Sequence, residues 1–109
     1  MPGAPRLIDL LASGPVAADG AMGTALIAAG LPAGMAPEAW LLADAGAAAV
    51  AAVHRAHVAA GARIVLTCTF GANPLRLADG TAAGRTAEVC RTAAAVARAA
   101  AGPDVVVAG

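Results

Sequence analysis

The sequence predicts an α/β fold in which short parallel strands alternate with helices. Residues 64–70 and 105–107 are runs of β-branched and apolar residues, a pattern typical of strands buried on both faces of a parallel sheet. A shorter apolar run, residues 16–18, is followed by Asp19-Gly20 and predicts a first strand. Helical patterns fill the intervals, and strands joined by helical crossovers are parallel.

Three short helices are predicted before residue 44, at residues 7–11, 24–29 and 37–40. Pro32 follows the second helix, where it blocks continuation, and Pro37 suits the first turn of the third.

Two longer helices have recognisable end signals. Asp44 is a plausible N-cap for a helix that ends before Gly61, and Thr86 for a helix that ends before Gly102. Helical spacing predicts which side chains face inward: Val50, Val53, His57 and Val58 in the first helix, and Val89, Ala93, Val96 and Ala100 in the second.

The composition excludes several classes of protein. Of 109 residues, 60% are hydrophobic and 13% charged, which is too apolar for a disordered tail. Seven Arg balance seven acidic residues without any Lys, so we expect no nucleic-acid partner. The apolar runs are too short to span a membrane. Two Cys and no secretory signal predict free thiols in the cytoplasm.

The number of predicted strands suggests part of a larger fold. Thirty-five residues are Ala, whose small side chains give little apolar area for a core. The third strand has no helix after it to cover its second face, whereas an eight-stranded α/β barrel needs ~250 residues. We therefore expect the front of a longer α/β fold.

Asp19 and Gly20 are candidate binding residues because they follow the first strand. Parallel α/β folds place their sites at the carboxyl ends of strands, and Gly20 lets a ligand approach the backbone closely. Alternatively, Asp19 caps the turn or the next helix. A nucleotide-binding turn is a further alternative, although the spacing is G-x-x-G and no Lys follows.

Thr67 is the second candidate position, at the end of the second strand. A period of two predicts that Thr67 and Thr69 point the same way and Cys68 the other way. Hydroxyl groups at this edge can bind a carboxylate, whereas the simpler interpretation is that Thr is a good strand residue.

The His and Cys residues do not predict a metal site. His54 and His57 are one helical turn apart, but no carboxylate or thiolate lies near them in sequence. We expect this His pair to be partly buried or surface-facing, and Cys90 to be a small buried apolar residue.

Several segments carry a resemblance to a known family. They are D-G-A-M-G-T at residues 19–24, P-E-A-W at 37–40, V-H-R-A at 53–56 with A-G-A at 60–62, L-T-C-T-F-G-A-N at 66–73 and V-V-V-A-G at 105–109. In this order they resemble the homocysteine S-methyltransferase family, which includes the homocysteine-binding module of cobalamin-dependent methionine synthase and the betaine–homocysteine methyltransferases.

The resemblance implies a (β/α)8 TIM barrel that holds zinc through three Cys thiolates. Homocysteine joins the zinc as a further sulfur ligand, and its bound thiolate stays nucleophilic because the metal lowers its pKa. The thiolate takes a methyl group from methylcobalamin, methyltetrahydrofolate or another methylated compound, which gives methionine.

Carried over to this sequence, the family pattern assigns roles in substrate binding. Asp19 would bind the ammonium of homocysteine, the Gly20 N–H would approach the substrate, and Thr67 would bind the carboxylate. The zinc cysteines of the family lie in later strands, near the sixth and the eighth. Cys68 stands where relatives often carry Asn or Phe, so it is not a matching metal ligand. We expect residues 1–109 to be the N-terminal part of a homocysteine-binding domain, with no catalytic or metal-binding residue and no activity alone.

A different class of function is also compatible with this sequence. An open three-stranded unit could be a non-catalytic module that associates with a partner chain, or with a copy of itself, through exposed sheet edges.

Overall fold

Two parallel strands form the centre of the fold, β1 (Ile64–Leu66) and β2 (Val106–Ala108). In the computed structural model, which describes residues 5–109, Ala18 adds an isolated parallel bridge to Ile64 on the other side of β1. The order Ala18, β1, β2 agrees with the predicted succession of parallel segments.

The strands are shorter than the sequence predicts. The expected strand at residues 16–18 is reduced to a single bridge, because the chain turns at Asp19-Gly20 directly after it. The expected strand at residues 64–70 ends at Leu66, because the Thr69 N–H donates to the Thr67 carbonyl and bends the chain away.

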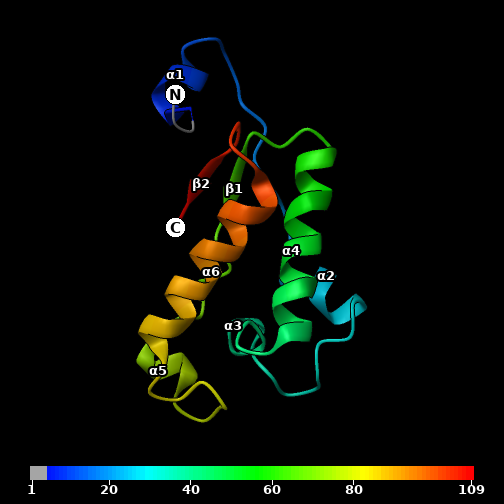
Figure 1. Cartoon of the computed structure of the whole chain (residues 1–109), viewed down its shortest axis with the longest axis vertical. Coiled ribbons are helices and arrows are strands. Elements are labelled where there is room, and N and C mark those ends of the chain that lie inside the picture. Colours follow the sequence, from blue (N-terminus) through cyan, green and yellow to red (C-terminus); the bar gives the residue numbers. More distant parts are fainter. Residues whose placement is uncertain (1–4) are drawn as a thin grey trace.

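Two long helices, α4 (Asp44–Ala59) and α6 (Thr86–Ala101), lie side by side along the strands (Figure 1). Val89 and Ala93 of α6 are buried as predicted, but Ala97 and Ala101 are buried in place of Val96 and Ala100, which are only partly covered. The buried residues of α4 are Gly46, Val50 and His54.

The predicted N-caps of both long helices are wrong by one residue. Ala43 and Arg85 occupy the cap positions without a side-chain hydrogen bond, which places Asp44 and Thr86 inside the first turn. The predicted end of α4 is confirmed, because Gly61 has a φ of +112° directly after the C-cap residue, a conformation that favours glycine.

Four short helices complete the described chain: α1 (Leu7–Leu11), α2 (Gly23–Ala28), α3 (Pro37–Trp40) and α5 (Pro74–Leu77). The α1 helix has no buried residue and lies at one end of the molecule, with α5 at the other end (Figure 1). Asn73 caps α5 by accepting a hydrogen bond from the Arg76 N–H at 2.8 Å.

The core has two parts. A larger cluster joins α2, α3, α4, α5 and α6, and a smaller one joins Val65 of β1 to Ala101 and Val105. The other face of β1 is open, since Leu66 is 55% exposed, so the expected burial of this strand on both faces is wrong. Within residues 5–109, none of the helices has the length and apolar character that crossing a membrane requires.

Gly46 fixes the contact between α3 and α4. A Cβ atom at this position would overlap the backbone carbonyl and the ring of Trp40. The absence of a side chain therefore lets the start of α4 pack directly against α3, whose residues Glu38 and Trp40 are buried.

Candidate functional site

A hollow of about 540 Å³ lies at the carboxyl end of β1 and brings together all three residues that the sequence singled out. Asp19, Gly20 and Thr67 all line it. Its walls come from three stretches of the chain, within residues 19–23, 36–38 and 66–71, together with Arg76. The expectation that neighbouring strand ends converge on one place is met for these residues.

The Asp19 side chain is anchored to β1. Its Oδ2 atom accepts a hydrogen bond from the Leu66 N–H at 3.0 Å, and the Asp19 N–H donates to the Ile64 carbonyl at 2.9 Å. Asp19 therefore caps the β1 backbone rather than α2, whose N-cap is Met22. Among residues 5–109, the second carboxylate oxygen of Asp19 has no hydrogen-bond partner and is available to a ligand.

The loop that carries Gly20 is tied to α4. A ring N–H of His57 donates to the Ala21 carbonyl at 3.1 Å. A Cβ atom on Gly20 would lie 3.5 Å from the His57 ring, which is ordinary contact. His57 thus holds the backbone beside Asp19 in place.

Thr67 and Thr69 form a pair of hydroxyl groups. Their Oγ1 atoms are 2.9 Å apart, and the Thr67 N–H donates to the Ala108 carbonyl of β2 at 2.8 Å. Cys68, between them, is buried in the larger core cluster. Thr67 and Thr69 thus lie on one side as predicted, whereas Cys68 packs into the core and also borders the hollow.

Cys68 is not suited to act as a nucleophile or a metal ligand. Burial, followed by the negative charge of Glu38, raises the pKa of the Cys68 thiol from 9.0 to about 12, so it remains protonated near neutral pH. Cys90 is partly buried and lies on α6, and both cysteines are free.

We expected both His54 and His57 to be partly buried or surface-facing. His57 is partly buried as expected, but His54 is not. The His54 ring is completely buried, and within the described residues neither ring nitrogen has a hydrogen-bond partner. Burial lowers the pKa of His54 because the imidazolium is poorly solvated there, an effect that the Asp19 carboxylate opposes and His57 reinforces.

The side chains of the described residues do not fit a zinc site. Within residues 5–109, no group of three or more His, Cys, Asp and Glu side chains is placed to hold a metal ion. Cys68 lies in the segment after β1 with its thiol held protonated, whereas Cys90 lies on α6.

Glu38 is a wall residue to which the sequence assigned no role. It is only 7% exposed, and its Oε1 atom accepts a hydrogen bond from the Gly71 N–H at 2.8 Å. Its signals in the sequence are an acid in an otherwise apolar segment and its place in the P-E-A-W motif that contributes to the family resemblance.

Arg76 is the second residue that the sequence did not single out. Its guanidinium lies 5.9 Å from the centre of the Phe70 ring and brings a positive charge to the wall of the hollow.

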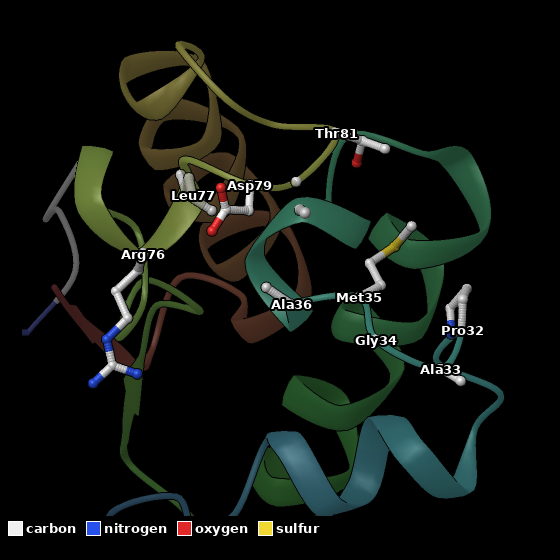
Figure 2. A pocket seen from close by; sticks show the side chains of 11 residues that line it. Pro32, Ala33, Gly34, Met35, Ala36, Arg76, Leu77, Asp79 and Thr81 are labelled. Carbon is white, nitrogen blue, oxygen red and sulfur yellow. The ribbon is translucent and has the colours of Figure 1, made fainter.

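A second hollow of about 500 Å³ adjoins the first and shares Ala36 and Arg76 with it. Its walls come from α3 and the loop before it, and from α5 and the loop after it. Arg76 lies at the opposite end from Pro32 and Met35 (Figure 2). None of the three candidate binding residues, Asp19, Gly20 and Thr67, lines this second hollow.

Comparison with known proteins adds one finding. A family model described as homocysteine S-methyltransferase matches residues 16–109, a range that contains every residue of the first hollow. This match confirms the resemblance seen in the sequence motifs. Neither the curated proteins nor the solved structures include a significant match.

Proposed function

Since the chain belongs to the homocysteine S-methyltransferase family, we propose that it binds the amino acid end of L-homocysteine in the hollow between Asp19 and Thr67. The observation that carries this proposal is the meeting of an acid, a glycine and a hydroxyl pair at the ends of adjacent parallel segments.

The groups of the hollow complement a zwitterionic amino acid. One carboxylate oxygen of Asp19 is held by Leu66, and the other binds the substrate ammonium through a charge-assisted hydrogen bond. The Thr67–Thr69 pair has two hydroxyl protons, of which one lies between the two oxygens. The other is free to be donated to the substrate carboxylate, which the positive charge of Arg76 also attracts.

We also make a proposal about the fold to which this hollow belongs. We propose that Ala18, β1 and β2 belong to the first three strands of a (β/α)8 barrel, with residues 1–109 as the N-terminal part of its homocysteine-binding domain. The parallel pairing in chain order and the hollow at the carboxyl strand ends support this arrangement.

The proposed reaction is methyl transfer to the sulfur of homocysteine, giving methionine. A carbon–sulfur bond forms as the bond between the methyl group and its donor breaks, and the thiol proton is lost. The donor is a methylated compound such as methylcobalamin or methyltetrahydrofolate. Because the described residues do not fit zinc, we assign this chain substrate binding alone and expect no turnover from it in isolation. We also propose a cytoplasmic location, which two free thiols favour.

Calorimetric titration of the 109-residue chain tests the binding proposal. We expect L-homocysteine to bind at least about tenfold more tightly than 4-mercaptobutanoate, which lacks the ammonium, or 3-mercaptopropylamine, which lacks the carboxylate. Equal affinity for all three thiols would exclude recognition of the amino acid end.

A second candidate function rests on exposed apolar side chains. Leu66 is 55% and Phe70 90% exposed, which favours a module that associates with a partner chain or with a second copy. Sedimentation velocity tests this alternative, since a concentration-independent monomer argues against self-association.

A further inference from the structure

Glu38 links two segments that are far apart in the sequence. It lies in α3, and its carboxylate oxygen Oε1 accepts the Gly71 N–H at 2.8 Å across 33 positions of the chain. Glu38 is 7% exposed, and Gly71 is also buried. This buried bond ties α3 to the segment that follows β1.

The segment that Glu38 holds is the one that carries Thr67. The Thr69 N–H donates to the Thr67 carbonyl at 2.8 Å, and the Ala72 N–H donates to the Thr69 carbonyl at 3.0 Å. These bonds fold residues 67–72 into a tight turn with the Thr67–Thr69 hydroxyl pair at its start. The Glu38 carboxylate joins this turn to α3, so a displacement of Gly71 is passed along the turn to the hydroxyl pair.

Gly71 makes the close approach of the carboxylate possible. A Cβ atom at this position would lie 3.2 Å from three atoms of the Glu38 carboxylate, which is tighter than ordinary contact. The φ of Gly71 is not positive, so the absence of a side chain matters here for space and not for backbone conformation.

We propose that Glu38 is a positioning residue, which fixes the turn at Gly71 and thereby sets the place of the Thr67 hydroxyl in the hollow. This role rests on the proposed binding of L-homocysteine at Asp19 and Thr67. It requires an oxygen acceptor at Glu38 and does not require its negative charge.

Four variants of the 109-residue chain separate these requirements. Glu38→Gln keeps an acceptor oxygen and removes the charge, whereas Glu38→Ala removes both. Gly71→Ala keeps the carboxylate and pushes it away, which covers the case in which Glu38→Ala does not fold. Glu88→Gln is the matched control, because Glu88 is exposed on α6 and pairs with Arg85 away from the hollow.

Two readouts are measured on each variant, the hydrogen exchange of the Gly71 amide by NMR and the Kd for L-homocysteine by calorimetry. For Glu38→Ala we expect Gly71 exchange to quicken, Thr67 resonances to shift and Kd to rise about tenfold. Gly71→Ala shifts the Thr67 resonances and weakens binding in the same direction. Glu38→Gln stays within about threefold of the parent Kd, and Glu88→Gln is unchanged.

Two results would overturn the proposal. Unchanged Gly71 exchange and unchanged Thr67 resonances in Glu38→Ala would show that Glu38 does not hold the turn. A loss of affinity in Glu38→Gln as large as that in Glu38→Ala, with Gly71 still protected, would mean that the charge itself contacts the ligand. Failure of the parent chain to bind L-homocysteine refutes the proposed binding function, but not the hold of Glu38 on the turn. In that case the exchange data still decide separately whether Glu38 holds the turn.

Discussion

The carboxylate of Asp19 and the backbone N–H of Leu66 are joined by a hydrogen bond of 3.0 Å, which fastens the proposed ammonium-binding group to the end of β1. Asp19 therefore combines this structural role with the proposed binding role, on different oxygens. The two roles can be separated by substitution.

Asp19→Asn keeps an acceptor for Leu66 but removes the negative charge. We expect its free energy of unfolding to stay within about 1 kcal/mol of the parent value while affinity for L-homocysteine falls at least about tenfold. Asp19→Ala also leaves the Leu66 N–H without its partner and lowers stability by about 1–2 kcal/mol. Urea denaturation and calorimetry measure the two effects, and unchanged affinity in Asp19→Asn would contradict the ammonium role.

His54 makes stability depend on pH. The folded pKa of His54 lies below 6.5 because burial disfavours the imidazolium, so between that pKa and 6.5 the unfolded chain binds more protons than the folded chain. The free energy of unfolding is therefore expected to fall as the pH drops below 6.5.

His54→Leu removes this dependence while filling a similar volume. Because two unpartnered buried nitrogens disappear, we expect it to be neutral or more stable near neutral pH, by up to about 2 kcal/mol. Denaturation curves at several pH values provide the measurement. The control His57→Gln retains His54 and should keep the fall in stability at low pH, and an identical fall in His54→Leu would refute this origin.

Gly46→Ala tests the direct packing of α3 on α4. The added methyl group overlaps Trp40, so we expect a loss of about 1–3 kcal/mol of stability even though Ala favours helices. Gly23→Ala in α2 is the control, since a Cβ atom there meets open space and should not destabilise. Thermal denaturation that ranks the two variants the other way round would show that this contact does not form.

The two cysteines should differ in reactivity. Cys68 is buried with a raised pKa, so iodoacetamide near neutral pH is expected to modify it more than about tenfold more slowly than Cys90. Mass spectrometry of the digested protein follows each site. The variant Cys90→Ser should remain almost unlabelled until denaturant is added, and equal rates at both sites would contradict the burial of Cys68.

The sequence alone was sufficient to predict that Asp19 and Thr67 share a hollow. Both follow parallel strands, and the carboxyl ends of such strands meet at one edge of a sheet whatever the details of packing. Thr67 and Thr69 lie together as a strand period predicts, but the structure achieves this through the bend at Thr67, because β1 ends at Leu66.

The Glu38–Gly71 bond and the burial of His54 depend on tertiary packing. Glu38 reaches its partner across 33 positions, which no local pattern encodes. His54 is buried only because α4 packs against its neighbours with the Gly46–Val50–His54 stripe inward. The predicted starts of α4 and α6 are wrong by one residue. The prediction relied on a capping hydrogen bond from the side chain of Asp44 or Thr86, whereas the caps are Ala43 and Arg85, which make no such bond.

The assembly of the hollow from three separated stretches of chain has a practical consequence. An unfolded chain cannot present these stretches together, so a small molecule that fits between them associates with the native state alone. By mass action, such a compound raises the melting temperature in step with the logarithm of its concentration. Thermal-shift screening of thiols and methylated compounds can thus rank candidate ligands before any enzymatic assay exists.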